Sequence, residues 1–189
     1  MKILVFGGSF NPIHIGHLHL ADEVVHQFKY DLVLFVPSNI SVHKEAKEPL
    51  IPQQRLTMIT LALKDPKFQL EGCEIERGGL SYSIETVRHL KEHYKPSGKM
   101  GFILGDDLIP GFKNWKEAET LSREVDLLVA HRRYKKNLFF DFPHKYCSNL
   151  LLAISSGDIR SRIFHNKPFR HLVPEKVGEY IMGQGLYGK

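Results

Sequence analysis

Cysteine is scarce in this sequence, and long apolar runs are missing from it. The chain of 189 residues has two cysteines, Cys73 and Cys147, and neither has a partner at C-x-x-C spacing. This argues against a disulfide framework or a cysteine-based zinc site and favours the reduced thiols of the cytosol. No uncharged apolar stretch approaches the ~20 residues of a membrane-spanning helix. The apolar segment 3–6 is also too short for a secretory signal. We therefore expect a soluble, cytoplasmic protein without a membrane partner.

The charge balance is basic, but no nucleic-acid recognition motif accompanies it. Lys and Arg number 26 against 21 for Asp and Glu, which gives a formal charge of +5. The basic residues are spread along the chain without an aromatic and basic pattern, so we expect no stable nucleic-acid partner. A cleft that holds several phosphates is an equally good cause of the positive balance. Composition alone leaves both causes open.

Short apolar runs alternate along the chain with segments of helical periodicity. Five runs have the length and near-continuous hydrophobicity of strands buried on both faces: 3–6, 32–36, 100–104, 127–130 and 150–154. Helical spacing predicts helices in the intervening and final segments: 18–28, 56–63, 83–94 with Ser83 as N-cap, 116–123, 158–164 and 174–182. This order is typical of an α/β fold with a doubly wound parallel sheet and helices on both faces. Ligands of such sheets bind beyond the carboxyl ends of the strands.

Two glycines end the first expected strand, and two histidines follow at the start of the first helix. Gly7 and Gly8 lack side chains where backbone N–H groups would approach a ligand, and a helix that begins near Gly16 directs its positive end to the same place. His14 and His17 can both face a bound phosphate there and donate hydrogen bonds to it. A single histidine is more often an ordinary loop residue, but this pair behind a Gly-Gly favours function. The segment contains neither G-x-G-x-x-G nor G-x-x-x-x-G-K-[ST].

The residues 14–17, His-Ile-Gly-His, resemble the H-x-G-H motif of the nucleotidyltransferase superfamily. The longer segment 7–18 resembles bacterial nicotinate mononucleotide adenylyltransferases, and four further segments match that family in order. The resemblance implies one Rossmann-like nucleotidyltransferase domain over residues 1–189, ending in a small C-terminal helical segment. It implies catalytic roles for His14 and His17. It also implies an ATP site that includes Gly7, Gly8, Ser9, Phe10 and Gly16.

Three segments resemble the parts of the family that bind the mononucleotide. Residues 37–44 resemble its Pro-x-x-x-Pro-Pro-His-Lys loop, although Ser41 and Val42 replace the two adjacent prolines. Residues 79–86 resemble its S-Y-T-x-D-T entry into a helix, where a hydroxyl could hydrogen-bond the carboxylate of a nicotinate. Residues 105–115 resemble its Gly-[Ala/Ser]-Asp and the Trp that stacks on the pyridine ring, with Asp106 as an unusual extra carboxylate. With an arginine from the basic run 131–136, the implied mononucleotide site comprises Asn39, Lys44, Thr86, Asp107, Trp115 and Arg132.

The segment 154–160 resembles the family's I-S-S-T-x-I-R motif, which binds the triphosphate of ATP, with Gly157 in place of the Thr. Taken from the residues alone, two serines at a helix start offer hydroxyl and backbone donors, and an arginine offers a planar fork for phosphate oxygens. The match extends the implied ATP site to Ser155, Ser156, Ile159 and Arg160.

The resemblance implies transfer of AMP from ATP to nicotinate mononucleotide, which gives nicotinate adenine dinucleotide and pyrophosphate in NAD biosynthesis. It implies direct in-line attack without a covalent intermediate. A Mg²⁺ ion would be held mainly by substrate phosphates and water, so no residue is assigned as a metal ligand. Related H-x-G-H enzymes that act on nicotinamide mononucleotide, phosphopantetheine or glycerol phosphate are the nearest alternatives. A non-catalytic nucleotide-binding or RNA-binding module is the alternative from another class, and a homo-oligomer is left open.

Overall fold

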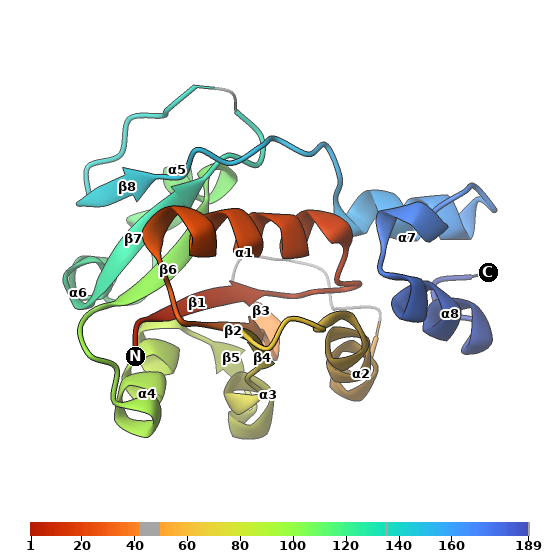
Figure 1. The fold of residues 1–189 in the computed structure, drawn as a ribbon, viewed down its shortest axis with the longest axis horizontal. Coiled ribbons are helices and arrows are strands. Elements are labelled where there is room, and N and C mark those ends of the chain that lie inside the picture. Colours follow the sequence, from red (N-terminus) through yellow and green to blue (C-terminus); the bar gives the residue numbers. More distant parts are fainter. Residues whose placement is uncertain (42–49, 135, 189) are drawn as a thin grey trace.

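A parallel sheet of six strands forms the centre of the molecule (Figure 1). The computed structural model describes residues 1–41, 50–134 and 136–188. The strands are β1 (Ile3–Gly8), β2 (Leu32–Pro37), β4 (Phe68–Leu70), β6 (Met100–Gly105), β7 (Val125–Ala130) and β8 (His144–Tyr146). Their order in the sheet is β4-β2-β1-β6-β7-β8, and all neighbouring strands pair in parallel. The order of connection reverses between β1 and β6, which is where doubly wound sheets bind their ligands.

Helices cover both faces of the sheet. One face packs against α1 (Ile15–Phe28), α2 (Pro52–Ala62), α7 (Ser156–Phe164) and α8 (Glu175–Gly183). The other packs against α3 (Cys73–Arg77), α4 (Ser83–Tyr94), α5 (Ile109–Phe112) and α6 (Ala118–Glu124). Short 3₁₀ helices span Asp106–Leu108 (η1) and Arg170–Leu172 (η2), and β3 (Ile40–Ser41) pairs with β5 (Leu80–Ser81) in a small second sheet.

The side chains of the central strands alternate between two hydrophobic cores. In β1, Leu4 and Phe6 belong to the core under α1, whereas Ile3 and Val5 belong to the core under α4. This alternation is the two-residue period of an extended strand, and burial on both faces requires every position to be apolar. The doubly wound α/β fold expected from the sequence is confirmed.

Three details of the expected secondary structure are wrong. Residues 150–154 form no strand: Leu150 is 61% exposed, and Ile154 packs on the core from an irregular connection to α7. The sheet instead ends in the short strands β4 and β8, which carry polar residues at alternate positions because they lie at its edges. Ser83 does not cap α4, because it is the first helical residue and Tyr82 is the N-cap.

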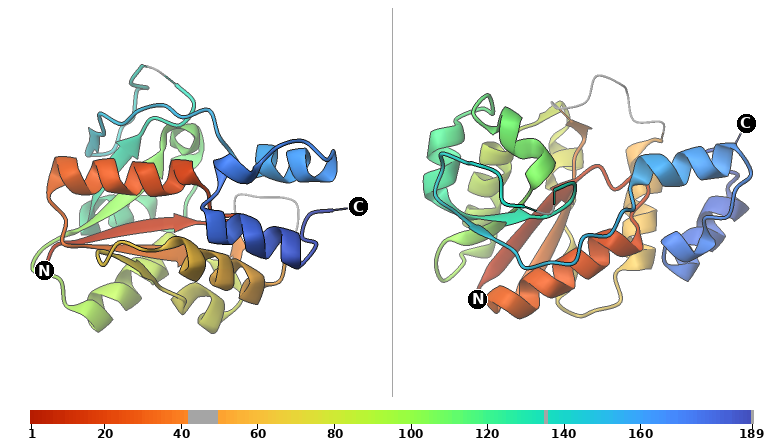
Figure 2. Two further views of the ribbon diagram at one scale, coloured as in Figure 1. Left: turned by 45° about the vertical axis from the view of Figure 1, so that its right-hand side comes forward. Right: turned by 90° about the horizontal axis from the view of Figure 1, so that it is seen from above.

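The C-terminal helices stand at the end of the sheet toward which β1 runs. Both views in Figure 2 show α7 and α8 next to each other there. Both cysteines are buried and free of disulfides. None of the helices within residues 1–41, 50–134 and 136–188 has the length and apolar character needed to span a bilayer.

Candidate active site

The loop after β1 is built around the ring of Phe10. This side chain is 2% exposed, its backbone has a φ of +46°, and its ring meets that of His17 edge-on at a centroid distance of 5.0 Å. A β carbon at Gly8 would lie 3.2 Å from the Phe10 ring, so a larger residue there would push on this ring. A β carbon at Gly7 would meet no atom within 4 Å, so the backbone there faces open space. Gly8 therefore accommodates the Phe10 ring, and Gly7 leaves its backbone accessible to a ligand.

His14 and His17 lie face to face at the start of α1. Their ring centroids are 3.6 Å apart, and the rings are inclined by 27°. The backbone N–H of His14 donates to Nδ1 of His17 at 3.2 Å, which places the proton of a neutral His17 ring on Nε2. A β carbon at Gly16 would lie 3.1 Å from Nδ1 of His14. Gly16 thus leaves the space in which the His14 ring stacks.

The ring of His14 is buried without a hydrogen-bond partner. It is 3% exposed, and although the backbone N–H of His17 faces it in capping-box geometry, neither ring nitrogen makes a well-formed hydrogen bond to a residue that the structure describes. Burial, and then the positive charge of Arg132, lower the pKa of His14 from 6.5 to about 4. Buried polar atoms are normally satisfied, so an unsatisfied neutral imidazole at this place indicates a group kept for a ligand.

Two side chains tie α7 to the loop after β1. Nη1 of Arg160 donates to the backbone oxygen of Asn11 at 2.7 Å, and Oγ of Ser156 donates to that of Pro12 at 2.8 Å. Ser155 is the N-cap of α7 and accepts the N–H of Asp158 at 3.1 Å. The structure thus brings the start of α7 next to the loop that leads to His14. It gives Ser155 a capping role, and Ile159, which is fully buried, a core contact.

One further residue of this junction was not expected from the sequence. Asn11 is fully buried, and besides accepting from Arg160 through its backbone it accepts the hydroxyl of Tyr187 at 2.5 Å through Oδ1. Its position between Gly8 and His14 could have indicated it, because a polar residue inside a tight loop between two candidate site residues is itself a candidate.

Asp106, Asp107 and Arg132 follow β6 and β7, at the same carboxyl end of the parallel sheet as the loop after β1. Nη1 of Arg132 lies 3.4 Å from Oδ2 of Asp107, and both side chains are partly exposed. A β carbon at Gly105 would press on Asp107 and would lie 2.7 Å from Cδ of Arg132, so these two side chains pass over a glycine. The carboxylate of Asp106 is fully buried and accepts backbone N–H groups of the segment that carries Arg132.

A cavity of about 620 Å³ lies between the β3–β5 sheet and the segment after α5. Its walls include Tyr82 and the half-buried Trp115, whose ring packs against Phe112 at 5.0 Å. Nζ of Lys116 lies 4.6 Å from the centre of the Tyr82 ring. Asn39 joins the two short strands, since its N–H donates to Oγ of Ser81 and its Nδ2 to the backbone oxygen of Gly79, both at 2.9 Å. The volume suits a small organic ligand with an aromatic part.

The chain is similar to known proteins over almost its whole length. The Cytidylyltransferase-like family model matches residues 5–162. Two proteins named "Probable nicotinate-nucleotide adenylyltransferase" are each 40% identical to the chain. The one from Borrelia garinii subsp. bavariensis is matched over 100% of this chain and 96% of the relative, and that from Treponema pallidum over 99% of each. The chain belongs to the nicotinate-nucleotide adenylyltransferase family.

The fold of this adenylyltransferase is also that of a solved structure. Plasmodium falciparum nicotinic acid mononucleotide adenylyltransferase complexed with NaAD has a TM-score of 0.81 at 20% identity, with 98% of this chain and 97% of that chain covered. The resemblance inferred from the H-x-G-H motif is confirmed, as is the assignment of the chain as an enzyme that transfers nucleotidyl groups.

Of the residues expected in the mononucleotide site of the adenylyltransferase, Trp115 lines the cavity and Thr86 lies in the interior away from it. The hydroxyl of Thr86 is 2% exposed and donates to Oε1 of Glu74 at 2.5 Å. Burial raises the pKa of Glu74, and Nη2 of Arg77 adds a 3.4 Å bond to the Thr86 hydroxyl. This hydroxyl therefore faces the interior between α3 and α4. Lys44 lies outside the described residues.

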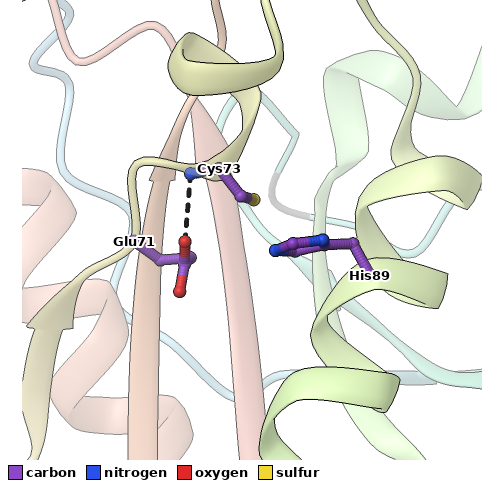
Figure 3. Close-up of side chains that lie close together, drawn as sticks. All are labelled: Glu71, Cys73 and His89. Carbon is purple, nitrogen blue, oxygen red and sulfur yellow. Dashed lines mark hydrogen bonds between the residues drawn. The ribbon is translucent and has the colours of Figure 1, made fainter.

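Among the residues that the structure describes, one group of His, Cys and carboxylate atoms is close enough to hold a metal ion. Glu71, Cys73 and His89 have potential ligand atoms within 4.8 Å of one another, and Figure 3 shows the Cys73 sulfur pointing toward the His89 ring. The carboxylate of Glu71 already accepts the N–H of Cys73 at 3.0 Å and the hydroxyl of Tyr94 at 2.7 Å. Burial, and then the nearby carboxylates, raise the pKa of the Cys73 thiol to about 12. The group is therefore a hydrogen-bonded contact between α3 and α4 built on a protonated thiol.

The depressed pKa of His14 predicts a loss of stability of the adenylyltransferase in mild acid. The unfolded chain binds a proton at this residue near pH 6.5, but the folded chain binds it only near pH 4. Stability from this residue is therefore present above pH 6.5 and is lost as the pH falls toward 4. At pH 5 the loss is about 2 kcal/mol. Urea unfolding at pH 7 and pH 5 should show the wild type losing about this much more than His14→Gln, whereas His26→Gln, at an exposed position of α1, should follow the wild type. A His14→Gln variant with the wild-type pH dependence would contradict the assignment.

Proposed function

We propose that this enzyme transfers AMP from ATP to the 5′-phosphate of nicotinate mononucleotide, releasing pyrophosphate and forming nicotinate adenine dinucleotide. One observation carries the proposal. His14 and His17 stack at the start of α1, beyond the reversal of strand order, and His14 is buried with unsatisfied nitrogens. The names of the relatives supply the substrate class, and the cavity beside Trp115 is of a size that fits a pyridine ring.

The chemistry requires no nucleophile from the protein, because the attacking group is itself a phosphate anion. A bond forms between an oxygen of the mononucleotide phosphate and the α-phosphorus of ATP, and the bond from that phosphorus to the pyrophosphate oxygen breaks. The tasks of the enzyme are to align the two anions and to stabilise the charge that builds on the α-phosphate. A neutral His14 has one N–H to donate to that phosphate, and His17 can donate from Nε2.

ATP is proposed to lie against the loop after β1 and the start of α7. Gly7 offers an open backbone, and Gly8, Ser9, Phe10 and Gly16 shape the loop that leads to the histidines. Arg160 and Ser156, which already hold this loop, are proposed to stabilise the leaving pyrophosphate, together with the first turn of α7 capped by Ser155 and anchored by Ile159.

The mononucleotide is proposed to lie beside ATP, between the segments that follow β6 and β7 and the cavity lined by Trp115. Trp115 stacks on the pyridine ring, and Arg132 and Asp107 meet the phosphate and ribose end. Asn39 and the start of α4 border the ring, and Thr86 supports that first turn from the interior through its hydroxyl bond to Glu74. Lys44 remains a proposed phosphate contact by the match of its sequence alone.

The groups around the proposed phosphate sites fit a Mg²⁺ ion that is bound through the substrate. Histidine, arginine and backbone N–H groups dominate there, and Asp107 is already paired with Arg132. The metal would thus be held by phosphates and water, and would neutralise phosphate charge when bound.

The experiment that tests this function compares acceptors in one assay. Pyrophosphate release from ATP is measured with nicotinate mononucleotide, nicotinamide mononucleotide, phosphopantetheine and no acceptor. We expect turnover with nicotinate mononucleotide and a kcat/KM at least about tenfold lower with the amide, since losing a charge-assisted hydrogen bond from the start of α4 to the nicotinate carboxylate costs about 1.4 kcal/mol or more. Equal rates with acid and amide would make the enzyme dual-specific. Turnover with phosphopantetheine alone, or with no acceptor, would overturn the proposal.

A further inference from the structure

The buried carboxylate of Asp106 serves as an anchor for the backbone that follows β7. It is fully buried and accepts three successive N–H groups: those of Arg132 and Arg133 on Oδ1, at 3.1 and 3.0 Å, and that of Tyr134 on Oδ2, at 3.0 Å. A carboxylate offers about four acceptor positions in one plane, whereas a serine hydroxyl offers two and alanine none. Asp106 can therefore satisfy the whole turn, which a shorter side chain could not.

The anchored turn places the guanidinium of Arg132 beside the carboxylate of Asp107. The buried carboxylate of Asp106 holds the backbone N–H of Arg132. The side chain of Arg132 crosses Gly105 and reaches Asp107 at 3.4 Å. The same positive charge acts on His14, since Arg132 contributes to the lowered pKa of that ring. A shift of the turn would thus move the guanidinium that pairs with Asp107 and whose charge acts on His14.

We propose that Asp106 is a positioning residue, which holds the 132–134 turn so that Arg132 meets the phosphate of the mononucleotide opposite His14. This inference rests on the proposed function, because it assigns the task of Arg132 in that reaction. Asp106 acts through Arg132 and does not itself touch a substrate.

The first test separates the two substrates. Asp106→Asn keeps the shape and one acceptor oxygen but turns an NH₂ group toward a backbone N–H. We expect kcat/KM for nicotinate mononucleotide to fall about tenfold while the KM for ATP stays within about twofold. Tyr146→Phe is the matched control, because it removes the hydroxyl that bonds N and O of Leu138 in the same connection but keeps the ring stacked on His131. It should retain wild-type kinetics within about twofold. An Asp106→Asn variant in which the KM for ATP rises as much as kcat/KM for nicotinate mononucleotide falls would overturn the proposal.

The second test is a double-mutant cycle with Arg132→Ala. If Asp106 acts through Arg132, adding Asp106→Asn to Arg132→Ala should lower kcat/KM by less than about twofold, since the side chain that it positions is gone. A tenfold loss in both backgrounds would show that Asp106 acts by another route and would overturn the proposal.

Hydrogen exchange tests the anchor independently of turnover. The amides of residues 132–134 should exchange at least about tenfold faster in Asp106→Asn than in the wild type, with the strands β1 and β6 unchanged. Unchanged exchange, or faster exchange spread over the whole sheet, would overturn the local anchor. A wild type that shows no turnover with nicotinate mononucleotide would overturn the proposed function instead, so the two failures have different signatures.

Discussion

Replacing His14 by alanine should lower kcat for pyrophosphate release by about 100- to 1,000-fold while ATP binds within about threefold of the wild type. The buried imidazole has no well-formed hydrogen bond to the described residues, so its N–H is free to donate to a bound phosphate. A donor directed at the α-phosphate gains most when charge accumulates there in the transition state. Steady-state kinetics with nicotinate mononucleotide, and calorimetric titration with a non-hydrolysable ATP analogue, measure the two quantities separately.

The matched control for this substitution is His19→Ala. His19 lies on the same helix, and its partly exposed ring pairs with Glu23 at 3.3 Å. Its loss should change kcat by less than about twofold, because exposed pairs contribute little. Circular dichroism checks that both variants are folded. If His14→Ala weakened ATP binding as much as it lowered kcat, His14 would be a binding residue and its proposed role in the transition state would be wrong.

The sequence predicts the centre of the fold well because burial on both faces leaves a strong pattern. The runs at β1, β2, β6 and β7 are almost wholly apolar, and each lies inside the sheet. Edge strands leave no such signal, since β4 and β8 have three residues each with exposed polar positions. The run 150–154 shows the converse, because Ile154 packs on the core from a segment without strand pairing. Apolarity reports burial, and strand pairing has to be inferred from more than that.

The same limit applies to the site. The pattern of His14, Gly16 and His17 could be interpreted from the sequence because their spacing at the start of α1 has a steric reason: Gly16 makes room for the His14 ring. The direction of a hydroxyl is set by tertiary contacts, and Thr86 turns toward Glu74, twelve residues earlier in the chain. Asp106 has no interpretable partner in the sequence, because the three N–H groups that it accepts lie 26 to 28 residues away.

Replacing Arg160 by alanine should lower kcat/KM for ATP by about 100- to 1,000-fold, which is about 3 to 4 kcal/mol. Two effects combine. Nη1 of Arg160 holds the backbone oxygen of Asn11 at 2.7 Å, so its loss frees the loop that leads to His14. The guanidinium is also the proposed contact of the leaving pyrophosphate, where charge develops as the bond to the α-phosphorus breaks. Arg160→Lys keeps the charge without the planar fork and should lose about tenfold.

Arg162 provides the control within the same helix. Its Nη1 also donates to a backbone oxygen, that of Pro168 at 3.0 Å, but this bond ties α7 to the segment before η2 and not to the loop after β1. Arg162→Ala should therefore change kcat/KM for ATP by less than about twofold. Initial rates at varied ATP and saturating nicotinate mononucleotide compare the three variants. Equal losses for Arg160→Ala and Arg162→Ala would mean that α7 needs its arginines for stability alone. A selective loss at Arg160 makes the loop–helix junction part of the ATP site, because the two positions differ in the loop that each side chain holds.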